Sequence, residues 1–187
     1  MLVLATKNKH KVEEIVPLLG DCSWREVGPA WHVEESGKTL VENAVLKATS
    51  ARPFCAVGDV ILGEDTGLFV GALGGAPGVY SARYAGLDVN FEQNISKLLY
   101  EMKGLKGDNR RAQFLTAAAL GFGDGSLIVS CGYLEGAIME EARGRQGFGY
   151  DAIFFCSSLG KTLAQLSREE KNSVSHRAKA VGALMPY

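Results

Sequence analysis

The sequence lacks the features that mark several large classes of protein. Lys plus Arg total 20 and Asp plus Glu total 21, a formal net charge of −1, so there is no broad basic surface with which to displace the counterions of a nucleic acid. No apolar run approaches the roughly 18 residues that span a membrane. Polar residues begin at Thr6, too soon for a signal peptide. We therefore expect a cytoplasmic protein that binds neither a nucleic-acid polymer nor a membrane.

Familiar ligand motifs are also missing. The chain has no Gly-Lys-Ser/Thr spacing of a P-loop, no internal repeat and no low-complexity linker. Its cysteines are far apart and lack the paired spacing of a zinc or redox motif; they are Cys22, Cys55, Cys131 and Cys156. We expect four free, buried thiols in a reducing cytoplasm.

What the chain has is the composition of an ordinary globular protein, with one excess. Hydrophobic residues are 47% and charged residues 22% of the 187, and this length favours one domain, residues 1–187, which can have two lobes. Glycine is over-represented, with 23 residues against a usual share of roughly 7%. Eight of them fall between Gly58 and Gly86. A turn needs one or two such residues, so this cluster favours a close backbone approach to a ligand.

Hydrophobic periodicity predicts an α/β fold. Helices are expected at 12–19, where Pro17 predicts a kink or an early end, at 39–51, at 91–102, and in two pieces after 162, with Ser175 as N-cap of the last. Strands are expected at 2–5, 24–27, 57–62, 114–122, 127–131, 133–139 and 153–155. Strands and helices interleave early and strands then run together, which predicts a mixed sheet.

The first candidate site lies between the first strand and the first helix. Backbone N–H groups and the positive end of a helix dipole converge there, and three lysines with polar neighbours suit phosphates. The residues are Thr6, Lys7, Asn8, Lys9, His10 and Lys11. A solvated helix start, with Asn8 as N-cap, explains the same segment equally well.

The second candidate site is the acidic pair Glu64–Asp65, expected where the apolar strand ends. Adjacent carboxylates beside an apolar strand are costly without a compensating cation. Oxygen ligands of this kind suit Mg²⁺, which keeps waters and pairs with substrate phosphates. The alternative is an acidic turn in which Asp65 makes a local hydrogen bond before Thr66 and Gly67.

Other candidates are weaker when taken singly. Lys47 lies on the polar arc of the second helix, where by itself it is interpreted as a solvated lysine rather than a ligand, and Glu34–Glu35 by themselves are an exposed acidic pair. In the C-terminal half, aromatic side chains between glycines are suited either to stacking on a base or to packing in the core. Cations and a histidine then precede the last helix, where a surface helix end is the plain alternative. These two clusters are Phe148, Gly149, Tyr150 and Asp151, and Lys171, Ser175, His176 and Arg177.

Taken in order, the motifs resemble the inosine triphosphate pyrophosphatase family. Five segments carry the likeness, which spans nearly the whole chain: Thr6-x-Asn8-x-x-Lys11, Glu64-Asp65-Thr66-Gly67-Leu68, Leu73-Gly-Gly-Ala-Pro-Gly-Val-Tyr-Ser-Ala-Arg83-Tyr84, Gly147-Phe-Gly-Tyr-Asp151 and Glu170-Lys171-Asn-Ser-Val-Ser-His176-Arg177. The resemblance implies a homodimeric, Mg²⁺-dependent hydrolase with an elongated central mixed sheet flanked by helices. Two lobes and an active-site cleft between them are also implied. Such enzymes convert ITP, dITP or XTP to the monophosphate and pyrophosphate and so cleanse the nucleotide pool.

The resemblance also implies roles for the candidate residues. Asp65 would bind metal and act as general base for water, with Thr66 as a neighbouring substrate contact and Glu35 as the second metal ligand. Residues 6–11 and Lys47 would hold the triphosphate. The purine would be framed by Phe148, Gly149, Tyr150, Asp151, Lys171, His176 and Arg177. Glu34 and Glu64 remain alternatives for the second ligand.

Three positions depart from the family pattern. Ala152 replaces a common proline, Glu64 replaces the aspartate of many bacterial members, and the last helix stops early, at Tyr187. None removes a residue that the chemistry needs. Rival hypotheses are a Maf-like pyrophosphatase of other modified or pyrimidine nucleotides, and a non-catalytic nucleotide-binding module. A nucleic-acid binder on a related fold fits poorly with the charge of −1.

Overall fold

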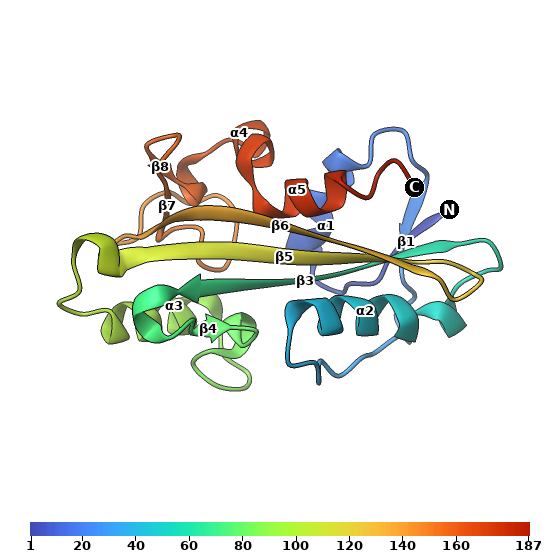
Figure 1. Ribbon diagram of the computed structural model, residues 1–187, viewed down its shortest axis with the longest axis horizontal. Coiled ribbons are helices and arrows are strands. Elements are labelled where there is room, and N and C mark those ends of the chain that lie inside the picture. Colours follow the sequence, from blue (N-terminus) through green and yellow to red (C-terminus); the bar gives the residue numbers. More distant parts are fainter. The chain divides into compact units, whose positions relative to one another are not determined.

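The chain folds around a mixed β-sheet, as a computed structural model covering residues 1–187 shows (Figure 1). The eight strands are β1 (Leu2–Leu4), β2 (Trp24–Glu26), β3 (Val60–Val70), β4 (Pro77–Gly78), β5 (Arg111–Gly121), β6 (Leu127–Ile138), β7 (Phe154–Cys156) and β8 (Lys161–Thr162). The five α-helices are α1 (Lys9–Ile15), α2 (Leu40–Ser50), α3 (Phe91–Glu101), α4 (Arg168–Val174) and α5 (His176–Gly182). Short 3₁₀ helices occupy Val16–Leu18, Arg52–Phe54, Gly71–Leu73, Ser81–Arg83, Gly107–Arg110 and Leu163–Gln165.

The sheet contains both parallel and antiparallel pairs. Its order is β2-β1-β3-β5-β6-β7-β8, with β4 pairing with β3 off this path. β1 lies parallel to both β2 and β3, whereas β3–β4, β6–β7 and β7–β8 are antiparallel. The predicted α/β class with a mixed sheet is confirmed.

Two compact units divide the chain. The first consists of Met1–Thr66, Thr116–Gly132 and His176–Tyr187, and the second of Gly67–Leu115 and Tyr133–Ser175. Each unit has a hydrophobic core of its own. The unit boundaries fall within β3, β5 and β6, so these three strands contribute residues to both units.

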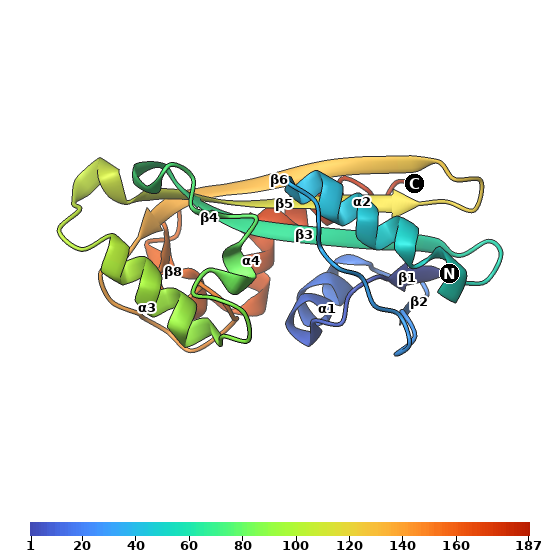
Figure 2. The ribbon, with the colours of Figure 1, turned by 90° about the horizontal axis from the view of Figure 1, so that it is seen from below.

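In the first unit, helices cover both faces of the sheet. α2 lies on one face, and α1 and α5 lie on the other (Figures 1 and 2). The core between α1, α5 and the strands contains Leu2, Leu4, Val12, Ile15, Leu19, Leu62, Ala118, Leu120, Ala180, Val181 and Leu184. On the α2 side, a Cβ at Gly63 would lie 2.2 Å from the carbonyl oxygen of Ala44 and 2.6 Å from the amide nitrogen of Ala48. Only glycine therefore allows α2 to pack this closely on β3.

In the second unit, α3 and α4 lie on opposite faces of the sheet (Figure 1). Leu98 and Met102 are fully buried there, and the rings of Phe114 and Phe154 pack with centroids 4.7 Å apart. Tyr150 belongs to the same core and is 4% exposed. It is thus a packing residue, the reading that the sequence had offered as the alternative to a base contact.

The helix starts match their sequence signals. The side chain of Asn8 accepts hydrogen bonds from the backbone N–H groups of His10 and Lys11, which makes it the N-cap of α1. Thr39 and Glu42 form a capping box at α2. α1 ends before Pro17, where the chain continues as a 3₁₀ turn. α5 begins directly after Ser175, as expected.

β3 is the element that the sequence predicted least well. A strand was expected at 57–62, ending before the acidic pair, but β3 runs from Val60 to Val70 through Glu64 and Asp65. Val57 lies outside it and is fully exposed. Gly63, Glu64, Asp65 and Thr66 therefore lie within a strand rather than in a turn. The separate strand expected at 133–139 is likewise part of the continuous β6.

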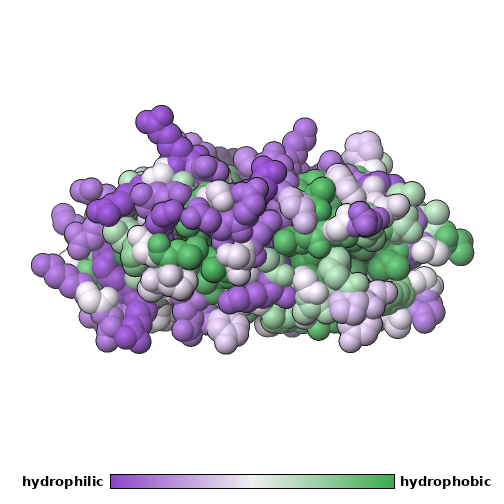
Figure 3. All heavy atoms as spheres, turned by 90° about the horizontal axis from the view of Figure 1, so that it is seen from above, coloured by the Kyte–Doolittle hydropathy of each residue, from purple (hydrophilic) through white to green (hydrophobic).

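The surface of the first unit carries scattered apolar side chains near the chain termini. Met1, Trp24, Leu127, Val129 and Tyr187 are each exposed by more than a third, and apolar colour reaches the surface over this part of the unit in Figure 3. Exposed apolar residues of this kind are normal in soluble folds. None of the helices has the length and apolar character that crossing a bilayer requires. All four cysteines are free thiols, as predicted, but only Cys156 is buried. Cys22 and Cys131 are exposed and Cys55 is half-buried, so the predicted burial is wrong for these three.

Candidate active site

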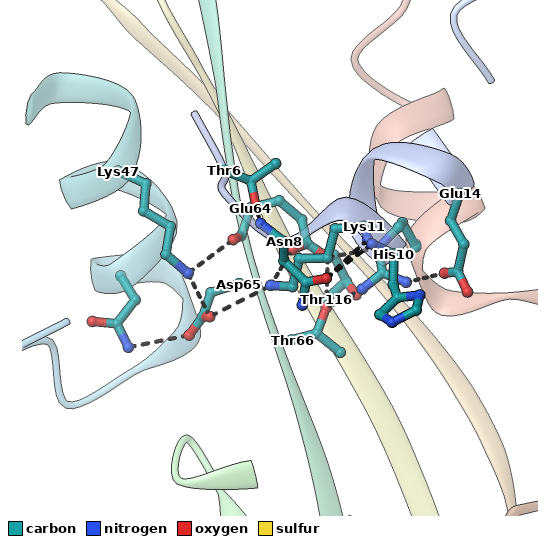
Figure 4. A network of polar contacts seen from close by, with 12 residues as sticks. Thr6, Asn8, His10, Lys11, Glu14, Lys47, Glu64, Asp65, Thr66 and Thr116 are labelled. Carbon is teal, nitrogen blue, oxygen red and sulfur yellow. Dashed lines mark hydrogen bonds and ion pairs between the residues drawn. The ribbon is translucent and has the colours of Figure 1, made fainter. Parts of the chain in front are cut away.

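The site is organised by alternation along β3. Successive side chains of a strand point to opposite faces, so Glu64 and Asp65, although adjacent, face different helices. Asp65 lies on the α2 side with Gly63, and Glu64 lies on the α1 and α5 side with Thr66 (Figure 4). Both carboxylates are buried, 2% and 5% exposed respectively. The acidic-turn alternative is therefore wrong, and each carboxylate needs its own partners.

On the α2 face, Asp65 is held by two side chains one helical turn apart. Nζ of Lys47 lies 2.8 Å from Oδ1 of Asp65, and Nδ2 of Asn43 donates to Oδ2 at 3.1 Å. Lys47 also donates to the carbonyl oxygen of Glu64 at 3.1 Å and lies 2.8 Å from Oε1 of Glu35. Lys47 is 6% exposed, so the interpretation of a solvated lysine is wrong.

The charge of Lys47 is stabilised by its carboxylate partners. Burial alone would lower the pKa of its ammonium group, but Asp65 and Glu35 outweigh that effect and raise the pKa above its ordinary value. Lys47 thus stays charged, and its ammonium group binds both Asp65 and the half-buried Glu35. Glu34, its neighbour in sequence, is exposed.

On the other face, Glu64 is enclosed by cations and a hydroxyl. Nε of Arg177 and Oγ1 of Thr66 donate to Oε1 at 2.8 and 2.6 Å, and Nζ of Lys11 lies 2.6 Å from Oε2. Arg177 also pairs with Glu14 of α1. Burial would raise the pKa of Glu64, but the charges of Arg177 and Lys11 hold it far below its usual range. Glu64 is therefore a carboxylate at every physiological pH.

Lys11 is the cation that reaches both carboxylates. Its Nζ is 4.0 Å from Oδ1 of Asp65 as well as 2.6 Å from Glu64. It extends from the first turn of α1, beyond the point where β1 stops pairing with β3 at Leu62. Because β1 leaves that edge of β3 uncovered, one side chain can approach both faces there.

Elsewhere in the segment at 6–11, the side chains of Thr6 and Asn8 hold the start of α1. Oγ1 of Thr6 accepts from the backbone N–H of Asn8 at 3.1 Å. Lys7 donates to the carbonyl oxygen of Pro29 at 3.2 Å, and Lys9 and His10 are exposed. Of the three lysines predicted here, the structure brings only Lys11 to the carboxylates.

A divalent cation fits this donor set only if protein carboxylates supply part of its coordination shell and other groups supply the rest. No group of three or more His, Cys, Asp or Glu side chains comes together as a metal centre. The carboxylates of Asp65 and Glu35, however, both contact the ammonium group of Lys47, each at 2.8 Å. Mg²⁺ commonly takes one or two carboxylates and completes its shell with water and substrate phosphates. The residues present are compatible with a metal ion of that kind.

The second unit holds a separate polar cluster. Oδ2 of Asp151 lies 2.5 Å from Nζ of Lys171 and accepts from the backbone N–H of Phe148 at 2.9 Å. The half-buried ring of Phe148 has Lys171 over it, 5.6 Å from the centroid. Gly147 is required here, because a Cβ would lie 2.0 Å from Oδ2 of Asp151 and φ is +72°. Gly149 follows in this loop with φ of +61°.

Tyr150, between these residues, is used differently. Its hydroxyl donates to the carbonyl oxygen of Ser81 at 2.9 Å, and burial raises its pKa. The structure therefore places Phe148, Asp151 and Lys171 together and directs Tyr150 into the core. His176 and Arg177 belong to the first unit.

Three site residues escaped the sequence reasoning. Asn43 lies one turn before Lys47 on the same face of α2, a spacing that could have indicated it. Glu14 lies three residues after Lys11 in α1 and is 9% exposed. Thr116, in the middle of β5, joins Thr66 and His176 by hydrogen bonds of 2.6 Å each. No sequence signal distinguishes Thr116 from other strand threonines.

The fold and the site define an α/β protein with buried carboxylates and lysines gathered at the edge of a sheet, a donor set suited to a cation and a polyanion. More specifically, the chain belongs to the Ham1 family, whose model matches residues 2–187. A dITP/XTP pyrophosphatase of Caldanaerobacter subterraneus is 43% identical over 191 residues, covering 100% of this chain and 94% of that protein. One of Pectobacterium atrosepticum is 44% identical, covering 98% and 95%.

Solved structures agree with this assignment. The Staphylococcus aureus Ham1 protein superposes with a TM-score of 0.87 at 38% identity, covering 99% of this chain and 96% of that one. A nucleoside-triphosphatase, dITP/XTP pyrophosphatase, of Mycobacterium abscessus gives 0.75 at 33% identity, covering 99% and 97%. These relatives confirm the resemblance that the sequence motifs indicated.

Proposed function

We propose that this protein hydrolyses non-canonical purine nucleoside triphosphates, ITP, dITP and XTP, to the monophosphate and pyrophosphate, and so cleanses the nucleotide pool. The observation that carries the proposal is the buried Asp65 carboxylate, with Lys47 at 2.8 Å and Lys11 at 4.0 Å. A carboxylate between two lysines suits a reaction in which water attacks a polyphosphate. The names of the curated relatives support this substrate class.

Mg²⁺ would be held by Asp65 and Glu35, which share the ammonium group of Lys47. When bound, the metal would stabilise the negative charge that develops on the phosphates. Glu64 is a poorer candidate because Arg177 and Lys11 already compensate its charge, and Glu34 is exposed. We therefore assign the second metal ligand to Glu35.

Asp65 would also act as the general base. Asn43 and Lys47 fix the two oxygens of its carboxylate, so the group is oriented before a substrate arrives. Lys11 and Lys47 would hold the triphosphate, assisted by residues 6–10, and would stabilise the charge on the pyrophosphate leaving group. Thr66 would contact the substrate beside them.

Base recognition is assigned to the residues that the family motifs implied. Phe148 offers a ring for stacking, and the Asp151–Lys171 pair offers an acceptor and a donor for the edge of a purine. A donor facing the 6-oxo group would reject adenine, because its amine would place donor against donor. Gly149, His176 and Arg177 complete this proposal. Tyr150, which is buried, would act indirectly, by holding the backbone of this loop in place rather than by touching the base.

A nucleotide panel tests the proposal. We expect pyrophosphate release from ITP, dITP and XTP with Mg²⁺, none with EDTA, and a loss of about 10²–10⁴-fold in kcat for Asp65→Asn. Asp124→Asn, the same chemical change in the exposed β5–β6 turn, is the matched control and should retain activity.

Three outcomes would contradict the proposal. Release of orthophosphate, or a preference for dTTP or UTP, would favour a Maf-like pyrophosphatase. Binding of ITP by calorimetry without turnover would favour a non-catalytic nucleotide-binding module. Separately, light scattering in solution tests the homodimer that the resemblance implies, and cell fractionation tests the cytoplasmic location.

A further inference from the structure

A line of hydrogen bonds runs from Glu64 to His176 through two threonines. Oγ1 of Thr66 lies 2.6 Å from Oε1 of Glu64, and 2.6 Å from Oγ1 of Thr116 (Figure 4). Oγ1 of Thr116 lies 2.6 Å from Nδ1 of His176. Thr116 is fully buried and His176 is 3% exposed. At these distances and in this burial, each pair must consist of one donor and one acceptor.

The donor and the acceptor of each hydrogen bond in this line can be assigned by starting from Glu64. Oε1 of Glu64 accepts from Nε of Arg177 at 2.8 Å, and a carboxylate can only accept. The proton of Thr66 must therefore point to Oε1, since two lone pairs facing each other at 2.6 Å would repel. The guanidinium of Arg177, which only donates, lies 3.2 Å from the same hydroxyl oxygen and agrees with this orientation.

With its one proton directed to Glu64, Thr66 can only accept from Thr116. The hydroxyl of Thr116 likewise has one proton, which is then used in the bond to Thr66. Its oxygen can only accept from His176, so Nδ1 of His176 must carry a hydrogen. In a neutral imidazole the other nitrogen, Nε2, is then an acceptor.

We propose that Thr116 is a positioning residue that transmits the orientation fixed by Glu64 to His176 and holds its neutral ring as the Nδ1–H tautomer, with Nε2 as an acceptor. This role extends the proposed function, because it determines what His176 can offer a ligand. An acceptor at Nε2 suits a partner that presents an N–H group, as a 6-oxopurine does at N1, and disfavours one that presents a lone pair there, as adenine does. The tautomer itself is independent of the substrate.

Nitrogen-15 NMR of the imidazole rings tests the tautomer directly, since the chain has only three histidines and His176→Gln identifies the relevant ring. In the wild type at pH 8 we expect a protonated Nδ1 and an unprotonated Nε2. Thr116→Val keeps the shape but removes the hydroxyl, so Nδ1–H would have no acceptor and the ring should change to the Nε2–H form. Thr116→Ser restores the hydroxyl and should restore the wild-type signature.

Two results would overturn the proposal: a wild-type ring that has its proton on Nε2 or on both nitrogens at pH 8, and a Val variant that keeps Nδ1–H. Thermal unfolding of both variants shows whether they fold, and the Ser variant keeps the test informative if Val does not. Where the proposed function holds, Thr116→Val should lower kcat/KM for ITP by about tenfold, with Ser near the wild type. A wild type inactive on ITP but with the expected tautomer would reject the proposed function and leave this inference standing.

Discussion

Replacing Arg177 with methionine should destabilise the first unit more than any change at its surface. The guanidinium is 2% exposed and pairs with both Glu14 and Glu64, which are 9% and 2% exposed. With Lys11, these four side chains comprise two positive and two negative charges. Arg177→Met keeps much of the side-chain volume but leaves two buried carboxylates with one cation.

The size of the effect follows from that imbalance. Removing one partner of a buried ion pair costs about 3–5 kcal/mol, because the remaining charge is desolvated without compensation. Adding Glu14→Gln to Arg177→Met removes the surplus carboxylate and leaves the Glu64–Lys11 pair. We expect the double variant to regain about 1–3 kcal/mol, the coupling usual for residues in one network.

Urea unfolding at pH 7 measures both effects. Trp24 and Trp31, the only tryptophans, both belong to the first unit, so their fluorescence reports its unfolding. Lys38→Met is the control, since Lys38 belongs to the same unit and is exposed, and the change should cost less than about 1 kcal/mol. The reasoning is refuted if Arg177→Met costs no more than this control, or if Glu14→Gln destabilises the Arg177→Met protein further.

Three further predictions, one of them with a control variant, concern other parts of the first unit and are tested by urea or thermal unfolding. Gly63→Ala should cost about 3 kcal/mol or more, because its Cβ would lie 2.2 Å from the carbonyl oxygen of Ala44. Gly121→Ala, where the nearest atom is 3.6 Å away, should cost less than about 1 kcal/mol, and equal losses would contradict the close-packing argument. Thr39→Ala removes the capping box of α2 and should cost about 1 kcal/mol; an unchanged midpoint would show that the cap contributes nothing. The pKa of Asp59 is lowered, chiefly by its hydrogen bond from Arg25, so its stabilisation is present above the ordinary carboxyl pKa of about 4 and is lost as pH falls through the folded value. Wild type should therefore lose more stability than Asp59→Asn between about pH 5 and pH 3, and parallel curves would reject that contribution.

Local signals in the sequence predicted local structure well. The capping box at Thr39 and Glu42, the cap at Asn8 and the break at Pro17 each depend on residues a few positions apart, and each occurs as expected. The periodicity of Phe91 to Met102 likewise gave α3. Such features are decided within one or two turns of chain, where the sequence holds all the partners.

Partners that are distant in sequence could not be found this way. Arg177 meets Glu14 and Glu64 across separations of 163 and 113 residues. Nothing near Glu14 in the sequence shows that a cation will cover it. The continuation of β3 beyond Leu62 was missed for a related reason. Glycine has a low strand propensity, yet in the fold the missing side chain of Gly63 is what allows α2 to pack on the strand.

The two neighbouring carboxylates differ because of their place in a strand. As a pair in sequence, Glu64 and Asp65 predict one cation held by both. In a strand their side chains diverge to opposite faces, so one cation can meet both only at the edge that β1 leaves uncovered, where Lys11 reaches them at 2.6 and 4.0 Å. Glu64, bound by Arg177 and Thr66, is then committed to holding α1 and α5 against the sheet. Asp65 shares Lys47 with the half-buried Glu35, which is why the proposed metal ion and the general base belong to the α2 face.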